Sequence, residues 1–229
     1  MDQYDALMEQ QRERARGASK FAGSAGLPAE LVASLHATEF KGYERLELDG
    51  CKVMALLKDG QPVTQLLAGE QGVVILERTP FYAESGGQAG DSGVLCSASG
   101  QLFEVADTQK LSAIFHGHIG SVKTGSIKTG DKLSARVDAA RRQATVINHS
   151  ATHLLHAALR AVLGEHVSQK DSLVTAERTR FDFSHFQPVS AEQLQAIESM
   201  VNAEIRKNDE AEVPHMNMHE ALDFGAMAL

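Results

Sequence analysis

Two histidines spaced by four residues are the side chains of this 229-residue chain whose type and spacing best suit chemistry. His149 and His153 stand in the stretch Asn148–His156, and residues i and i+4 of a helix lie side by side. Two neighbouring imidazoles are able to bind one zinc ion. A structural zinc site needs about four protein ligands and a catalytic site about three, so the pair supplies only part of a site.

The residues around the pair predict the long helix that positions it. Asp138 suits the N-cap and Gly164 suits the residue after the last turn. Between them, apolar residues recur at intervals of three and four: Ile147, Ala151, Leu154, Leu155, Ala158, Leu159 and Val162. At about 100° per residue, both histidines lie roughly opposite this stripe, as do His156 and Arg160. The spacing alone allows a solvated polar surface or a metal-binding pair, and it favours the solvated surface.

A glycine-rich stretch lies upstream of this helix, where Gly86 and Gly87 are flanked by Glu84 and Gln88. Backbone N–H groups without neighbouring side chains are able to approach an anion, so the stretch is a candidate phosphate cradle. Its spacing matches neither a P-loop nor a dinucleotide-binding fingerprint. Taken alone, the stretch favours a plain tight loop between strands.

Turn residues and apolar periodicity divide the chain into three predicted regions. Residues 1–35 contain a polar helix over 1–19, whose narrow apolar stripe needs a partner, and a small-residue linker. Residues 36–137 show short β-runs separated by turn residues at roughly ten-residue intervals, which is typical of a small antiparallel β-barrel. Residues 138–229 return to helices.

The third region predicts an α+β domain. The residues around Leu173 and Arg180–Phe183 suit a hairpin after the histidine helix. A second long helix follows, with Ser190 as its N-cap and Gln193 as the partner in a capping box. The fold class expected for the whole chain is therefore α+β, with a short helical segment before the barrel.

Composition indicates a globular protein. The chain has 43% hydrophobic and 23% charged residues, and its longest aliphatic run, Val73–Leu76, is too short to cross a bilayer. The acidic start does not resemble a signal sequence. Cys51 and Cys96 lie in apolar stretches without C-x-x-C spacing, which favours buried reduced thiols. We expect a soluble, cytoplasmic protein with no membrane partner.

Four stretches in a fixed order carry a family resemblance: Glu77–Gly93, Asn148–His156, His166–Lys170 and Arg180–His185. They resemble the editing region of alanyl-tRNA synthetases and of their free-standing editing relatives, over about residues 36–229. The resemblance implies that a two-layer α+β editing domain, like that of threonyl- and alanyl-tRNA synthetases, follows the barrel. It also implies that residues 1–35 end a helical tRNA-recognition region and that the chain is an internal piece of a longer synthetase.

The function that the resemblance implies is hydrolytic proofreading. A pocket for alanine discriminates weakly against one added hydroxyl group, so a second site hydrolyses mischarged seryl-tRNA(Ala), and glycyl-tRNA(Ala) as well. By resemblance, Thr152 and Gln169 lie near the aminoacyl group, where we expect them to recognise the serine hydroxyl or to orient the ester. The resemblance also implies substrate-facing loop residues, which are Glu84, Gly86, Gly87 and Gln88.

The cofactor that the resemblance implies is zinc, held by His149 and His153, to position the ester or to activate a water molecule. Family members complete the site with a Cys-x-x-x-His stretch beyond the second helix, which is absent up to Leu229. We therefore expect an incomplete site in this chain, metal-free or holding zinc far more weakly. His215 and His219 are also spaced by four, but a proline precedes them and they stay unassigned.

A second departure from the family pattern is Asp171, where the family usually has glycine after Gln169 and Lys170. The conformation of this turn and its charge beside the substrate are therefore open questions.

The implied partners are the 3′ acceptor end of tRNA(Ala) and the remaining domains of the same synthetase. Net charge is in tension with an RNA partner, because 22 Lys and Arg residues stand against 30 Asp and Glu residues, a net charge of −8. Only the acceptor end has to be received, so a few local bases suffice. Candidates, each of which alone is better explained as a solvated charge, are Lys123, Lys128, Lys132, Arg141, Arg142 and Lys170.

Two other functions stay open on the sequence alone. The chain is also compatible with a non-catalytic module that docks the tRNA acceptor end, and with a metal hydrolase that cleaves an unrelated ester. Of the three, we rank the editing module first and the docking module second.

Overall fold

The computed structural model describes residues 27–210 and 216–225. The helix expected over residues 1–19, most of the linker after it and His215 lie outside the described residues. The chain divides into two compact units, one made of residues up to Glu84 and Gly90–Asp138, the other of Ser85–Ala89 and the residues from Ala139 onward. The domain limits expected from the sequence stay a prediction, and the sequence did not assign the short segment Ser85–Ala89 to the second unit.

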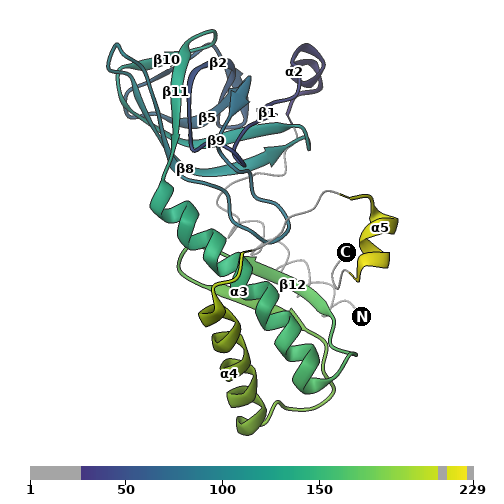
Figure 1. The fold of residues 1–229 in the computed structure, drawn as a ribbon. Helices are drawn as coiled ribbons and strands as arrows, with labels where there is room; N and C mark the ends of the chain where they lie inside the picture. Colours follow the sequence, from purple (N-terminus) through teal and green to yellow (C-terminus); the bar gives the residue numbers. More distant parts are fainter. Residues whose placement is uncertain (1–26, 211–215, 226–229) are drawn as a thin grey trace, which may run out of the picture. The chain divides into compact units, whose positions relative to one another are not determined.

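The first unit is built around a six-stranded antiparallel barrel (Figure 1). Its strands are β2 (Glu47–Lys58), β5 (Gln71–Leu76), β7 (Gly93–Cys96), β8 (Leu102–Leu111), β9 (Phe115–Thr124) and β11 (Lys132–Val137). They are hydrogen-bonded in the order β11-β7-β8-β9-β5-β2, and pairing of β11 with β2 closes the ring. The antiparallel barrel predicted from turn spacing is confirmed.

Shorter elements complete the first unit: α2 (Ala29–Ser34), β1 (Glu39–Phe40), β3 (Gln61–Val63), β4 (Gln65–Leu67), β6 (Arg78–Thr79) and β10 (Ser126–Lys128). Strand β1 pairs in parallel with β6, and β4 pairs with β10. Asp59 and Gly60, both at positive φ (51° and 76°), form the two-residue turn between β2 and β3, as expected for an Asp-Gly hairpin.

The barrel core is apolar, and buried residues alternate with more exposed ones along most of β8 and along β11, whereas β2, β5 and β9 contain runs of buried residues. Phe81, Phe103 and Leu133 are fully buried within one continuous cluster. Cys51 is buried there as a free thiol, whose pKa is raised by burial, and Cys96 is half-buried and also free. The prediction of reduced cysteines agrees with this packing.

One histidine, His118 of β9, is fully buried in the barrel unit and is satisfied on both ring nitrogens. Its Nδ1 lies 2.8 Å from the carbonyl oxygen of Val74, which only accepts, so Nδ1 carries the proton. Its Nε2 therefore accepts from the Thr79 hydroxyl at 2.7 Å, and that hydroxyl in turn accepts from the backbone N–H of Phe81. Burial is the main cause that lowers the pKa of His118 to about 4.

The second unit contains two long helices and a hairpin. Its elements are α3 (Ala139–Leu163), β12 (Gln169–Val174), β13 (Thr179–Phe183), α4 (Ala191–Lys207) and α5 (Met218–Phe224). Helix α4 packs along α3 (Figure 1), and β12 pairs with β13 in antiparallel fashion. The α+β class is confirmed, while the likeness to a two-layer editing fold stays a prediction.

The start of α4 and the end of α3 follow the local rules used to predict them. Ser190 caps α4, and the reciprocal contacts with Gln193 form the expected capping box. Gly164 follows α3 with a φ of 117° and donates its N–H to the carbonyl of Arg160. None of the helices in the described part of the chain is both long and apolar enough to cross a membrane.

The two faces of α3 differ from the pattern read off the sequence. Leu155, Ala158 and Leu159 belong to the cluster shared with α4, as expected, but Ile147 is 57% exposed. His156, expected on the polar side, is 2% exposed and its ring lies 5.1 Å from that of Phe181 in β13. The hairpin covers His156, while His153 on the same predicted side stays exposed.

We predict that His118 makes the stability of the chain depend on pH. Its pKa is lower in the folded state than the ordinary 6.5, so its contribution is complete above about pH 6.5 and is lost as the pH falls toward 4. The loss amounts to about 3 kcal/mol over that range. Urea unfolding at several pH values measures it, and His118→Gln should flatten the dependence between pH 6.5 and 5.

His219 supplies a control, because its side chain is 88% exposed. His219→Gln should leave the pH dependence unchanged. An equally steep dependence in His118→Gln and in the original chain would rule out His118 as its source.

Candidate functional site

The predicted metal-binding pair lies on α3 with its two rings facing each other. His149 and His153 have ring centroids 5.0 Å apart and planes at 27°, and their Nε2 atoms are 3.1 Å apart. The i, i+4 spacing of the helix produces this arrangement. The two Nε2 atoms therefore lie within hydrogen-bond distance of each other.

Gln88 fixes the tautomer of His149. Its Oε1 lies 2.6 Å from His149 Nδ1, and an amide oxygen only accepts, so Nδ1 carries the proton. The Nε2 lone pair of His149 then faces His153. Burial, and to a lesser degree the nearby His153, lowers the pKa of His149. The His149 ring is therefore neutral near pH 7.

Gln88 reaches the helix because a tight turn precedes it. Ser85 and Gln88 exchange two backbone hydrogen bonds of 3.2 and 3.1 Å around Gly86 and Gly87, whose φ values are 58° and 81°. Positive φ at both central residues is the type I′ arrangement that favours glycine. The tight loop expected from the sequence is present, but it belongs to the second unit, where it joins the edge of β12.

Gly87 lies in close contact with that edge. Its carbonyl accepts from the N–H of Val174 at 2.8 Å, and Ala89 donates to the carbonyl of Val174 at 2.9 Å. A Cβ atom on Gly87 would overlap the carbonyl oxygen and the hydroxyl of Ser172, whereas a Cβ atom on Gly86 would meet no atom within 4 Å. Of these two glycines, only Gly87 is required by close packing.

Thr152, predicted to contact the aminoacyl group, is 7% exposed. Its hydroxyl donates to the carbonyl of Asn148, one turn earlier, at 2.8 Å, and lies 2.6 Å from the hydroxyl of Thr179. A hydroxyl has one proton and two acceptor positions, so Thr152 receives the Thr179 proton and keeps one acceptor position.

Gln169 begins β12 and is exposed. Its side-chain Nε2 donates to the hydroxyl of Ser172 at 3.2 Å. The register of the hairpin shifts between Gln169 and Asp171, which leaves Lys170 as the extra residue of a β-bulge. Asp171 does not adopt positive φ and its carboxylate pairs with Arg180 at 2.6 Å, so no glycine is needed there and its charge has a partner.

Glu84 lies in the first unit, unlike the other predicted substrate-facing residues. Its carboxylate accepts from Gln109 Nε2 at 2.6 Å, and its backbone N–H donates to the carbonyl of Thr108. The structure therefore places Gly86, Gly87 and Gln88 in the unit of the histidines, and it gives Glu84 partners within the barrel unit.

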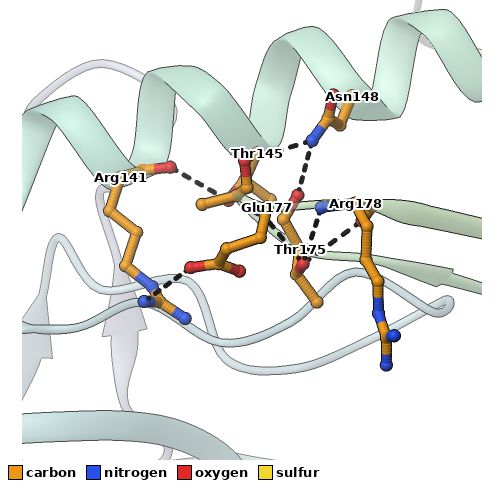
Figure 2. Close-up of polar contacts among 7 residues, drawn as sticks. Arg141, Thr145, Asn148, Thr175, Glu177 and Arg178 are labelled. Atoms are coloured by element: carbon orange, nitrogen blue, oxygen red, sulfur yellow. Dashed lines mark hydrogen bonds and ion pairs between the residues drawn. The ribbon is translucent and has the colours of Figure 1, made fainter.

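Polar contacts hold the hairpin turn against the first half of α3, as Figure 2 shows. Asn148 donates to the carbonyl of Thr175 at 2.8 Å, and Arg141 pairs with Glu177 at 3.2 Å. Within the turn, the Thr175 hydroxyl accepts from the N–H groups of Glu177 and Arg178. Sequence reasoning assigned no role to Asn148, although it directly precedes His149.

The donors present fit part of a zinc site. Two nitrogen ligands of a tetrahedral zinc ion lie about 3.3 Å apart, close to the observed 3.1 Å, and a ligating histidine commonly donates its other N–H to an oxygen, as His149 does to Gln88. Without metal, the same distance suits a hydrogen bond from His153 to His149. Within residues 27–210 and 216–225, no group of three or more His, Cys, Asp or Glu side chains is arranged to hold a metal ion.

His156 stands one turn beyond the pair and has an unusual position. Its Nε2 is the one buried side-chain nitrogen or oxygen without a hydrogen-bond partner among the described residues. Burial and the neighbouring Arg160 lower the pKa of His156, so the ring is neutral against Phe181. It packs as an apolar ring beside the pair.

Comparison with known proteins extends the resemblance over the chain. The family described as tRNA synthetases class II (A) matches residues 1–141. Alanine–tRNA ligase of Stenotrophomonas maltophilia (strain K279a) is 62% identical over 226 residues, 99% of this chain and 26% of that protein. Alanine–tRNA ligases of Xanthomonas oryzae pv. oryzae (strain PXO99A) and Xanthomonas campestris pv. campestris (strain 8004) are 57% and 58% identical over 229 residues, again 26% of each.

These matches confirm the resemblance stated from the four motif stretches. The chain spans about a quarter of the length of the curated relatives it matches, since each alignment covers 26% of the relative. The alignments with the alanine–tRNA ligases include the whole helix that carries the two histidines, whereas the family match ends at residue 141, near the start of that helix.

We predict different effects for the two glycines of the turn. Gly86→Ala should cost only the strain of positive φ, about 1–2 kcal/mol of unfolding free energy. Gly87→Ala carries the same strain and also pushes the turn away from Ser172, so it should remove the hydrogen bond from His149 to Gln88. Histidine side-chain NMR reads the proton on His149 Nδ1, and urea unfolding reads stability.

Gly86→Ala is the matched control, because both residues have positive φ in one turn. Equal effects of the two substitutions on the His149 resonance would contradict the close contact of Gly87.

Proposed function

We propose that this chain, which belongs to the family of tRNA synthetases class II (A), contains an editing site that hydrolyses the aminoacyl ester of seryl-tRNA(Ala) and glycyl-tRNA(Ala). The observation that carries the proposal is the arrangement of His149, His153, Thr152 and Gln88 on and against one helix. The names of the relatives, alanine–tRNA ligases, support tRNA(Ala) as the substrate. The activity would be cytoplasmic, with the other domains of the synthetase as partners.

A site of this kind has to recognise a hydroxyl group. Excluding serine from an alanine pocket by size is inefficient, whereas a polar partner that would be left unpaired discriminates strongly. Thr152 keeps one acceptor position after its bonds to Asn148 and Thr179, and the serine hydroxyl has a proton to donate to it. This role requires Thr152 to be held rigidly, which its burial and its two partners favour.

Gln169 suits the orientation of the ester. One N–H of its side-chain amide is engaged by Ser172, and the exposed amide keeps a second N–H for the ester carbonyl. Donors directed at a carbonyl oxygen stabilise the charge that develops during hydrolysis. The open backbone at Gly86 would allow the tRNA end to approach.

His149 and His153 would hold zinc together with ligands from elsewhere, and Gln88 would keep His149 in the tautomer whose Nε2 is free to bind. Bound zinc would polarise the ester carbonyl or lower the pKa of a water molecule. In this chain, the contact with Gln88 leaves the Nε2 lone pair of His149 facing His153.

The decisive experiment measures release of serine from seryl-tRNA(Ala) by this chain and by the complete product of its gene. Thr152→Val removes the hydroxyl while conserving shape, so we predict a fall of about 10²-fold in kcat/KM for seryl-tRNA(Ala). The fall for glycyl-tRNA(Ala) should be much smaller, because glycine has no hydroxyl group to recognise. His153→Ala should lower both rates together.

Thr145→Val is the matched control, because the Thr145 hydroxyl also donates to the carbonyl one turn earlier, at 3.0 Å, and Thr145 is also 7% exposed. It should leave both rates unchanged. Equal losses for the seryl and glycyl substrates in Thr152→Val would remove hydroxyl recognition from Thr152. No deacylation by the complete product would favour a non-catalytic docking module instead.

A further inference from the structure

The barrel unit carries a cavity of about 240 Å³ that none of the residues assigned above lines. It is lined by Lys41, Glu44, Arg45, Leu48 and Arg78. Three of these five side chains are cationic and one is a carboxylate, in a chain whose net charge is −8. The cations give this cavity a local excess of positive charge, which favours an anionic ligand.

The backbone explains why these cations meet. Strand β1 pairs in parallel with β6, and Lys41 continues this pairing by donating its N–H to the carbonyl of Thr79 at 2.9 Å. The chain then turns, with the N–H groups of Glu44 and Arg45 both directed to the carbonyl of Lys41. Gly42 is buried in this turn, where a Cβ atom would overlap the carbonyl of Pro80.

The three cations differ in how far they are already engaged. Arg78 donates one N–H to the carbonyl of Asp49 at 3.0 Å, which holds its guanidinium at the cavity and leaves further donors. Lys41 pairs with the exposed carboxylate of Glu39 at 2.7 Å. The guanidinium of Arg45 makes no hydrogen bond or ion pair with the described residues, so its planar donor fork remains available to an oxyanion.

An exposed aromatic side chain stands in the same turn. Tyr43 is 84% exposed, and its ring meets that of Phe40 edge-on at a centroid distance of 4.9 Å. Proteins that bind single-stranded nucleic acids combine exposed aromatic rings with cations, because a base stacks on the ring while the phosphate meets the positive charges; here both kinds of side chain come from the turn 41–45. A free inorganic anion would explain the cations and would leave Tyr43 without a role.

We propose that this cavity and Tyr43 form a nucleotide subsite for single-stranded RNA, with a phosphodiester held by Arg45, Arg78 and Lys41 and the adjoining base stacked on Tyr43. The proposal rests on the proposed function in that it takes tRNA as the source of the strand. The subsite lies on residues that the charge pattern of the sequence did not single out.

The test is fluorescence anisotropy with this chain and a short fluorescein-labelled single-stranded RNA at several salt concentrations. Arg45→Ala should weaken binding about tenfold and lower the slope of log K against log salt by about 0.7, as for one lost phosphate contact. Lys58→Ala is the matched control, since Lys58 is a barrel cation paired with Glu70 at 2.6 Å. Equal effects of Arg45→Ala and Lys58→Ala would overturn the proposal.

Tyr43 tests the stacking half of the subsite. Tyr43→Ala should weaken RNA binding roughly 5- to 100-fold with an unchanged salt slope, and Tyr43→Phe should bind like the original chain. Circular dichroism checks that each variant is folded. If Tyr43→Phe loses as much affinity as Tyr43→Ala, or if inorganic phosphate competes as well as the RNA does, the nucleotide subsite is wrong.

These outcomes separate the subsite from the editing activity. RNA binding that depends on Arg45 and Tyr43, without any deacylation, would support the subsite and contradict the proposed editing activity. Deacylation of seryl-tRNA(Ala) with an unchanged KM in Arg45→Ala and Tyr43→Ala would support the hydrolase and remove the subsite.

Discussion

The hydrogen bond between Gln88 and His149 is the interaction on which the candidate site depends. It selects the His149 tautomer whose Nε2 lone pair faces His153, and Gln88 belongs to a short segment that lies between β6 and β7 in the sequence. That segment reaches β12 only because Gly87 has no side chain to collide with Ser172. A site of few groups thus rests on the backbone contacts of one turn, and the tautomer of His149 is set outside the helix that carries the pair.

Three histidines illustrate how environment decides the use of one residue type. His118 is fully buried with both nitrogens satisfied by Val74 and Thr79, which makes it a structural residue of the barrel. His149 has one nitrogen satisfied and the other directed at a second imidazole, so it retains a lone pair for chemistry. His156 is buried without a partner for Nε2 and serves packing against Phe181. Spacing in the sequence separates none of these cases.

Local rules explain what the sequence could predict. Turn residues predicted the barrel, and the capping box of Ser190 and Gln193 predicted the start of α4. Both signals lie within a few residues of the feature that they form. Contacts between residues far apart in the sequence could not be predicted from local patterns. The burial of His156 depends on where the hairpin packs, and the meeting of Arg45 with Arg78 depends on the parallel pairing of β1 with β6. The Gly-Gly turn was recognisable, whereas its attachment to β12 was not.

The acidic balance of the chain is compatible with an RNA partner when the range of each force is considered. A net charge of −8 repels RNA over about a Debye length, roughly 8–10 Å at physiological salt, and so disfavours nonspecific binding along the surface. Stacking on Tyr43 and a guanidinium fork such as Arg45 act at contact, where direct interaction outweighs the screened field. An RNA strand that depends on a few such contacts binds only where these contacts lie together. Repulsion by the acidic surface elsewhere increases this selectivity.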